Sequence, residues 1–464
     1  MRKVLILALI VLVLIPFGLW VAARRALASD LARTTLERQL SIHLARPVRV
    51  GSAAAAIFPQ IAVELGDVTV GDAPPVRIGR ITVVTGLRSL FTRTLADTNI
   101  RSLAFRDLVL GTAEQTLTID LDSSITGDRL DIARLTARAR GTRIVASGAL
   151  TSLSRIEGAF AVTADPLDLA EMIALGSAIA PPGAPGAQPA PMRLALTVTA
   201  PGTTFGTYQL ADLSTRAEVV PGRFALDDLA FRIFGGTFRG RLGADTRGAA
   251  PALRLTGEVA GLDVTQVLQS SGSPGGVTGR LTASLALQGS GGDAASLLQA
   301  ARGSLSATIT DGTLPHLDLV RSVVLAFGKP SGVPPEGAGT AFKRLGGTFA
   351  LASATLTSDN LTLASRDLDA QGRGSFNLES GTVDARADVV LSPELTAQSG
   401  TDLRRYAQEN GRVIVPATVT GRLNAPRLSI DVAAATRRAV GNELKRRATD
   451  FLSGLFKKKK KGGG

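Results

Sequence analysis

The chain of 464 residues contains no cysteine and two histidines, His43 and His316. Without cysteine it can form neither a disulfide nor a zinc–thiolate site. Two histidines far apart in the sequence do not build a metal centre of several imidazoles. Aromatic residues make up 4% of the chain. The apolar residues are therefore mostly leucine, valine and alanine, and the large side chains that usually fill a thick core are scarce.

Signatures of common enzymes are also scarce. There is no G-x-S-x-G elbow, and FGKP (327–330) lacks the first glycine of a P-loop. GSGGDA (289–294) matches the G-x-G-x-x-A pattern of dinucleotide-binding folds. However, the strand expected before it alternates polar and apolar residues, whereas a first Rossmann strand is buried on both faces. We interpret the segment as a turn leading into a helix over 294–302 that is capped by Asp293.

One histidine has acidic neighbours in the sequence. Asp311 and Asp318 flank His316 and could form an acid–base pair with it. The sequence places no nucleophile or third partner beside them. We therefore expect a structural or surface histidine, and a protein that is not an enzyme and has no catalytic residue, cofactor or metal site.

Positive charge is concentrated at the two ends of the chain. The formal net charge is +13, of which residues 1–40 carry +4 and residues 436–461 carry +8, which leaves +1 for the long middle. A nucleic-acid-binding protein is expected to carry basic residues on its folded body, interleaved with aromatics. The distribution excludes nucleic acid as an expected partner and is more typical of contacts with anionic membrane surfaces.

The segment VLILALIVLVLIPFGLWVAA (4–23) has no charged residue. As a helix it would span about 30 Å, the thickness of one hydrocarbon layer. We predict a transmembrane anchor over 1–25, with Leu5 and Leu12 in the hydrocarbon and Trp20 at the interface. The alternative is a secretory signal, because ALA (26–28) resembles a cleavage site. The apolar run is longer than the roughly 7–15 residues of a signal core, and both readings send the remaining chain across the membrane.

Polar and apolar residues alternate along most of the chain. In TVDARADVVLS (382–392) the apolar residues alternate with Asp384, Arg386 and Asp388, which is typical of a strand with one dry and one wet face. Similar strands, several after a Gly-rich step, are expected at 117–123, 194–200, 279–287, 303–309, 347–353, 374–380 and 421–432.

Two architectures can cover so many dry faces. In a two-sheet sandwich the faces pack on each other; in one curled sheet the apolar face lines a groove. Because aromatic filler is scarce, we predict a mainly β protein with an elongated, curled antiparallel sheet that forms an apolar groove, together with a few short helices. The candidate groove-lining residues are Leu117, Ile119, Leu121, Leu194, Leu196, Val198, Val383, Ala385, Ala387, Val389 and Leu391.

Both ends of this body are expected to carry helices. Leucines at helical spacing predict a helix over 26–45, and a short one is expected at 87–93. Residues 436–464 read as a basic amphipathic helix with a lysine tail. It either contacts a membrane or partner or docks on the sheet, and its contact residues would be Leu444, Phe451, Leu452, Leu455 and Lys457.

The expected organisation has five parts. The anchor (1–25) is followed by a helix-plus-β domain (26–175) and a Pro/Ala-rich loop (176–192). A β-groove (193–435) and the basic helix (436–464) complete the chain.

Several segments resemble the AsmA family. TLERQLSIHLARPVRVGSAAAAIFPQIAVELGDVTVGD (35–72) and TGLRSLFTRTLADTNIRSLAFRDLVL (85–110) are similar to its opening domain. LQGSGGDAASLLQAARGSLSATITDGTLPHLDLV (287–320) and LTSDNLTLASRDLDAQGRGSFNLESGTVDARADVVLSPEL (356–395) are similar to its end domain.

The resemblance implies a single-pass inner-membrane protein with its body in the periplasm. Larger relatives form β-grooves proposed to conduct phospholipids, and the family affects outer-membrane protein assembly. The expected function is thus non-enzymatic phospholipid transport or outer-membrane biogenesis, with phospholipid acyl chains, the inner membrane and outer-membrane assembly or transport proteins as partners. The alternative is a structural or assembly factor that acts through protein–protein contacts.

Overall fold

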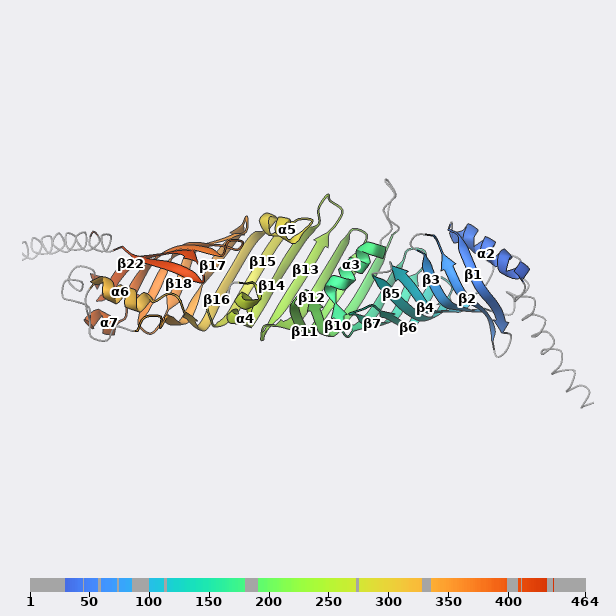
Figure 1. Cartoon of the computed structure of the whole chain (residues 1–464), viewed down its shortest axis with the longest axis horizontal. Helices are drawn as coiled ribbons and strands as arrows, with labels where there is room; N and C mark the ends of the chain where they lie inside the picture. Colours follow the sequence, from blue (N-terminus) through green and yellow to red (C-terminus); the bar gives the residue numbers. More distant parts are fainter. Residues whose placement is uncertain are drawn as a thin grey trace, which may run out of the picture. The chain divides into compact units, whose positions relative to one another are not determined.

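The computed structural model describes residues 30–431 except 45, 57–59, 73–74, 86–99, 112–114, 180–190, 273–274, 328–334, 399–407 and 410, together with residue 437. The chain divides into two compact units, Met1–Asp228 and Leu229–Gly464. The division falls inside β12 (Arg223–Ile233). Each unit is a curled, open sheet with a few short helices (Figure 1). The mainly β, antiparallel, curled fold predicted from the alternation is therefore confirmed at this level.

The described part of unit 1 contains two helices, a run of antiparallel strands and a crossover. Its elements are α2 (Asp30–Leu44), β1 (Val48–Ala56), β2 (Ile61–Val70), β3 (Val76–Thr85), β4 (Ile100–Gly111), β5 (Thr116–Thr126), β6 (Arg129–Arg138), β7 (Arg143–Ser152), β8 (Glu157–Ala164), β9 (Leu167–Asp168), α3 (Leu169–Ile179), β10 (Arg193–Phe205) and β11 (Tyr208–Val220). Consecutive strands from β1 to β8 pair antiparallel. β10 pairs parallel with β8 and β9 and antiparallel with β11. A parallel pair needs a crossover, and α3 lies in that connection.

Unit 2 is a meander whose helices lie in the hairpin connections. Its elements after β12 are β13 (Gly236–Asp245), β14 (Ala252–Asp263), α4 (Val264–Ser270), β15 (Arg280–Ser290), α5 (Ala294–Ala300), β16 (Arg302–Leu314), α6 (Leu319–Phe327), β17 (Thr340–Ala352), β18 (Thr355–Ala364), β19 (Leu368–Asn377), β20 (Thr382–Leu391), α7 (Pro393–Gln398), β21 (Gln408–Glu409), β22 (Arg412–Arg422) and β23 (Ala425–Ile430). α4, α6 and α7 follow the ends of β14, β16 and β20, so all three lie at one margin of the sheet. α5 lies at the opposite margin (Figure 1).

Several sequence predictions can be compared with these elements. The helix expected over 26–45 is observed as α2, and α5 begins after Asp293, whose side chain accepts a hydrogen bond from the backbone N–H of Ser296 in a capping box. The segment at 289–294 is thus a turn into a capped helix, as predicted. α3, α4, α6 and α7 were not predicted.

Other predictions fall outside the described residues. These are the anchor with Leu5, Leu12 and Trp20, the helix at 87–93, and the C-terminal helix with Leu444, Phe451, Leu452, Leu455 and Lys457. Among the helices that the structure describes, none is long and apolar enough to cross a membrane. Most of the loop expected at 176–192 is likewise not described, and the predicted domain limits stay predictions.

Aspartates in left-handed backbone interrupt the strands and bend them. Asp67, Asp107, Asp212, Asp228 and Asp311 have φ between 50° and 53°. Asp107 lies where the β4–β5 register shifts between Phe105 and Leu108. Aspartate tolerates this conformation better than most residues. Bulges of this kind bend a strand and increase its twist, and they therefore contribute to the curl of each sheet.

Helix α2 protects the free edge of the unit 1 sheet. β1 pairs with β2 on one side. On its other side Glu37 Oε1 accepts the N–H of Val50 at 2.7 Å, and Ser41 Oγ accepts the N–H of Val48 at 2.9 Å. An exposed edge is a template for pairing with another chain, so these bonds block edge-to-edge association.

We predict that Glu37→Ala loosens this edge. The Val50 N–H loses a charged acceptor, and the local free energy of opening should fall by about 1–2 kcal/mol. Hydrogen exchange of residues 48–56, followed by mass spectrometry, measures this change. Glu64→Ala is the matched control, because Glu64 is an exposed residue on the neighbouring strand. Equal exchange in both variants would contradict the assignment.

Candidate functional site

The candidate site is the apolar face of each sheet, which the register assembles from separate strands. In unit 1 cross-strand neighbours form one continuous row. Its members are Leu65, Ile81, Phe105, Leu121, Leu135, Ala146, Val162 and Val198. Two predicted lining residues from distant parts of the sequence, Leu121 and Val198, therefore share a row.

The other predicted residues of unit 1 lie in neighbouring rows of the same face. Leu196 is in register with Phe160 and Ala217, and Leu194 with Val219. On β4 and β5, Ile119 lies opposite Leu108, and Leu117 lies opposite Leu110. All six predicted residues, Leu117, Ile119, Leu121, Leu194, Leu196 and Val198, are half-buried.

Helix α3 covers part of this face. Leu169 and Met172 pack against a cluster of Ala164, Leu167 and Ala200. The helix contacts β10 and also β4, although four strands lie between those two in the sheet. The strands between them curl around it.

In unit 2 the same kind of face has an open part and a sealed part. Leu285, Leu305 and Phe349 lie opposite one another on β15, β16 and β17, and Leu255 lies opposite Leu287 on β14 and β15. All five are half-buried. We call these five residues the open strip.

Another row of the same face is sealed by helices of the same unit. Leu363, Ala370, Val389 and Val415 are in register, and their exposed fractions are 7%, 9%, 1% and 0%. They form one core cluster with residues of α4 and α6, including Val323. The protein itself covers the face along the margin where α4, α6 and α7 lie (Figure 1).

Polar bonds fix α6 over this core. Thr340 Oγ1 accepts the N–H of Leu319 at 2.9 Å and donates to the carbonyl of Leu317. Asp318, directly before the helix, accepts the N–H groups of Gly337 and Gly339 at 2.9 and 2.6 Å. The two bonds of Thr340 are buried, and together with the bonds of Asp318 they hold the N-terminal end of α6 in place over the core cluster.

The predicted lining residues of β20 fall into both environments. Val383, Ala385 and Ala387 are half-buried, whereas Val389 and Leu391 are 1% and 2% exposed within the core cluster. The alternation predicts the face on which these residues lie. The alternation does not indicate the helices that cover the core cluster in which Val389 and Leu391 are buried.

Two phenylalanines, Phe238 and Phe342, pack against glycines of this face. A Cβ on Gly257 would lie 2.6 Å from Cζ of Phe238, and one on Gly312 would lie 2.4 Å from Cζ of Phe342. Phe238 also stacks on Phe231 with ring centroids 4.9 Å apart. Because glycine has no side chain, it leaves the space that each of these two rings occupies on the apolar face.

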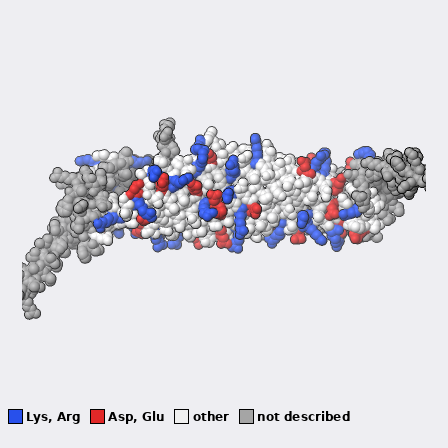
Figure 2. All heavy atoms as spheres, turned by 180° about the vertical axis from the view of Figure 1, so that it is seen from behind, with Lys and Arg blue, Asp and Glu red and all other residues white. Residues whose placement is uncertain are grey.

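The opposite face of the sheets is polar and carries charges of both signs. Arg193 and Glu218 form an ion pair at 2.9 Å across β10 and β11, and Arg106 pairs with Asp122 across β4 and β5. Figure 2 shows basic and acidic side chains interspersed on one side of the molecule. Exposed pairs of this kind contribute little to stability.

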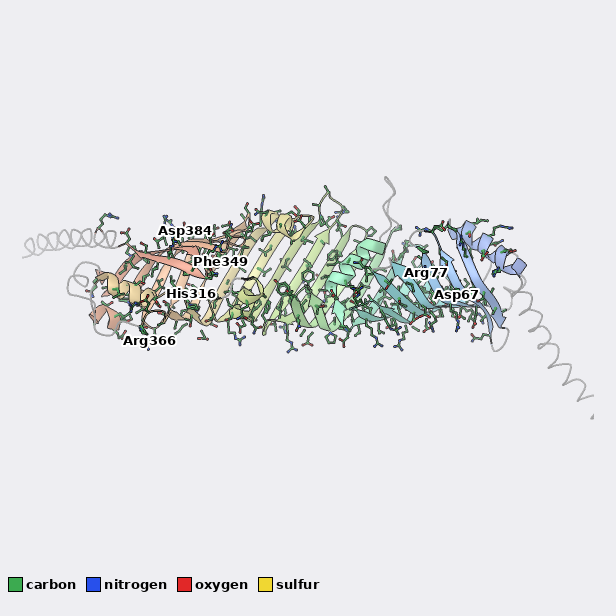
Figure 3. All side chains as sticks on the ribbon, viewed as in Figure 1. Asp67, Arg77, His316, Phe349, Arg366 and Asp384 are labelled. Carbon is green, nitrogen blue, oxygen red and sulfur yellow. The ribbon has the colours of Figure 1, made fainter. Side chains whose placement is uncertain are left out.

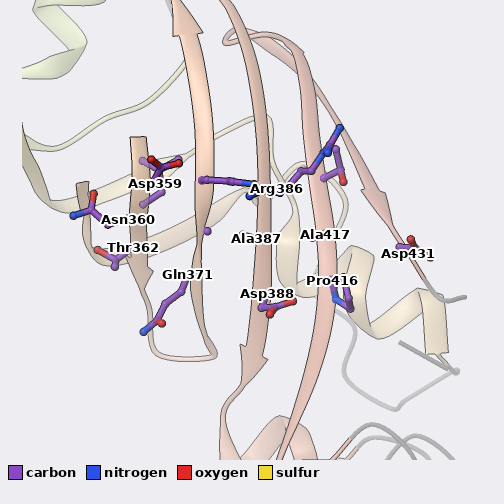
Figure 4. A pocket seen from close by; sticks show the side chains of 14 residues that line it. Asp359, Asn360, Thr362, Gln371, Arg386, Ala387, Asp388, Pro416, Ala417 and Asp431 are labelled. Atoms are coloured by element: carbon purple, nitrogen blue, oxygen red, sulfur yellow. The ribbon is translucent and has the colours of Figure 1, made fainter. Parts of the chain in front are cut away.

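Two shallow depressions lie on this side. The one in unit 2 has a volume of about 960 Å³ and is open to solvent (Figure 4). Its charged lining residues are Asp359, Arg373, Arg386, Asp388 and Asp431. The one in unit 1, of about 850 Å³, is lined by Arg193, Arg216, Glu218 and Asp227 among others. Mixed charges open to water do not form a selective site for a small ligand.

No catalytic arrangement is visible around His316 in the described residues. His316 lies between β16 and α6 (Figure 3), where its Nε2 would be 3.1 Å from a Cβ on Gly275. Its sequence neighbours have structural roles, since Asp318 holds the backbone of the loop before β17 and Asp311 occupies a left-handed bulge position. The described residues contain no group of three or more metal-ligating side chains.

Two carboxylates with a lowered pKa lie in a turn and at a helix cap. Hydrogen bonding from the Ser152 hydroxyl lowers the pKa of Asp128, and hydrogen bonds from Ser296 lower the pKa of Asp293. Both carboxylates are exposed and bind local groups, so neither is poised for proton transfer at neutral pH.

Comparison with known proteins identifies one family. The model of the AsmA family matches residues 194–363, from β10 to β18. No curated protein and no solved structure matches the chain. The matched range contains 287–320, one of the segments whose sequence resembles the AsmA family. The resembling segments at 35–72 and 85–110 lie N-terminal to the matched range.

The two environments on β20 predict that an introduced aspartate destabilises unit 2 strongly at one position and little at the other. Val389→Asp places a charge in a sealed core and should destabilise unit 2 by more than about 3 kcal/mol. Ala385→Asp, four residues earlier on the same face, should leave the unit folded. Thermal unfolding followed by circular dichroism measures both, and a similar loss for the two variants would contradict the division.

Proposed function

We propose that this chain binds phospholipid without catalysing a reaction and holds the acyl chains against the apolar faces of its sheets. Residues 194–363 match the AsmA family. The family is associated with envelope membranes, outer-membrane biogenesis and lipid transport. We further propose that the chain is anchored in the inner membrane with its body in the periplasm. The observation that supports the proposal most directly is the open strip of unit 2.

The open strip has the chemistry of a hydrocarbon-binding surface. Leu255, Leu285, Leu287, Leu305 and Phe349 offer no hydrogen-bonding side-chain group and are half-buried. Each methylene that leaves water on such a surface contributes about 0.8 kcal/mol. Burial of a few methylenes of the acyl chain against each strand is therefore enough for reversible binding. Because the hydrophobic effect is non-directional, it would not fix the acyl chain at one position along the strip.

The distribution of charge supports a mobile ligand. The chain between its two basic ends carries +1, and Arg–Asp and Arg–Glu pairs are spread over the polar face. Over the part of the chain that the structure describes, a phosphate at the rim of the apolar face would meet charges of both signs, which would hold it weakly. Recognition of acyl chains with little headgroup selectivity is therefore part of the proposal.

The alternative is an assembly factor that acts on outer-membrane proteins through protein contacts. It needs no apolar surface accessible to lipid, and a sheet sealed along its length would suit it. The half-buried open strip favours lipid handling over this alternative, whereas the sealed row at α6 fits both.

The experiment is lipid analysis of the full-length chain purified from membranes in mild detergent. Leu305→Asp should lower the phospholipid that co-purifies by about fivefold, which is about 1 kcal/mol, because it places a carboxylate in the open strip. Ser306→Asp is the matched control, since Ser306 is the next residue on β16, is exposed and lies on the polar face.

The two variants separate the candidate functions. Reduced lipid with Leu305→Asp alone supports lipid handling, provided that both variants show the thermal unfolding of the parent. Absence of phospholipid from the parent protein would contradict the proposal and leave the assembly factor in its place.

A further inference from the structure

Helix α3 occupies the position where an acyl chain moving along the unit 1 face would have to pass. It packs on β10 and on β4, with β5, β6, β7 and β8 between them in the sheet. In a flat sheet β4 and β10 would be about 24 Å apart. The contact with both places the helix across the concave side of the curl. We propose that α3 is a movable plug that divides the apolar face of unit 1, and this inference rests on the proposed lipid function.

The sheet-facing side of α3 is apolar but weakly anchored. Leu169 and Met172 rest on Ala164 and Ala200, two small side chains that bury little area, and Leu175 is 2% exposed. The cluster on which α3 packs contains three buried residues, whereas the cluster that α6 joins contains fourteen, including Leu319 and Val323 of α6 itself. Because apolar stabilisation scales with buried area, we expect α3 to be easier to displace than α6.

The side of α3 that faces away from the sheet is apolar as well. Ile173 has an exposed fraction of 64%. A surface helix of a globular protein normally presents polar residues there. An acyl chain that reaches α3 therefore meets an apolar surface on the helix as well as on the sheet.

Polar bonds that hold α3 lie at its N-terminal end. Glu171 accepts the N–H of Gly141 with both carboxylate oxygens, at 3.2 and 3.0 Å. Thr142 Oγ1 accepts the N–H of Asp168 at 3.0 Å, and Asp168 Oδ1 accepts the N–H of Glu171 at 3.0 Å. These hydrogen bonds, here called the clasp, restrain the helix, and we expect α3 to move away from the sheet when they are broken.

With the helix in place, the face of β4 is separated from the face of β10. Phe105 on β4 is half-buried and packs against the core cluster of β1 to β3. When α3 swings away, the row that contains Phe105, Leu121 and Val198 becomes continuous for an acyl chain. The plug thus controls whether lipid reaches the N-terminal strands of unit 1.

The test is lipid photocross-linking in the full-length chain in its membrane. p-Benzoylphenylalanine replaces Phe105, beyond the plug, or Phe349, in the open strip of unit 2. With α3 intact we expect lipid adducts at Phe349 and few at Phe105. Glu171→Ala removes the clasp and should raise the adduct at Phe105 at least about fivefold while the adduct at Phe349 stays constant.

The matched control is Glu157→Ala, which removes an exposed carboxylate on β8 that pairs with Arg155. It should leave both adducts unchanged. Hydrogen exchange of residues 169–179 reports whether α3 is released in each variant. If Glu171→Ala does not release it, Leu175→Asp places a charge at a nearly inaccessible position and serves as the second variant.

The outcomes separate the plug from the lipid function. Strong adducts at Phe105 in the parent, or a released α3 without any rise at Phe105, would overturn the plug while Phe349 still reports lipid. Absence of adducts at both positions in every variant would overturn the lipid function itself.

Discussion

The cross-strand register of the curled sheets is the constraint on which the rest of the structure depends. Because side chains alternate between faces, a slip of one residue would exchange the apolar and polar faces of a strand. Leu285, Leu305 and Phe349 come from three strands and are neighbours only because their pairing is in register. The apolar face therefore results from strand pairing, and each additional paired strand widens it.

Period-two alternation predicted both the strands and the face of each residue. In 382–392 it placed Val383, Ala385 and Ala387 on one side, and the pairing of β20 with β19 and β22 keeps them there. Asp293 was predicted as a helix cap from its position before an apolar run, and its capping box is observed. These signals are local, so they can be read without knowledge of the three-dimensional structure.

Features that depend on contacts between distant segments could not be predicted. The sequence does not distinguish Asp107, which bends β4 in a left-handed bulge, from an aspartate on a solvated face. The parallel pairing of β8 with β10, and with it the position of α3, depends on a crossover that alternation does not encode. Val389 alternates as Ala385 does, yet Val389 is buried in the core cluster that α4 and α6 join, whereas Ala385 is half-buried.

The same physical rule accounts for the sealed and open parts of the apolar face. The connection between β16 and β17 holds α6, whose Leu319 and Val323 join the core cluster, whereas α5 between β15 and β16 has no buried residue. Where a connection is a tight turn, as at Ser353 and Ala354 between β17 and β18, no helix is added at that point of the margin. The helices that the connections hold, and whether those helices pack on the face, thus determine which part of the face the protein itself covers.

The most direct measurement of the central claim is a photocross-linking scan of residues 304–309 on β16 in the full-length chain in its membrane. The account predicts phospholipid adducts at Leu305 and Ala307, few at Ser304, Ser306 and Thr308 on the polar face, and few at Ile309, which packs against the sealed core cluster. Adducts at neither set of positions, or adducts at both sets with equal yield, would contradict the claim that this face binds acyl chains.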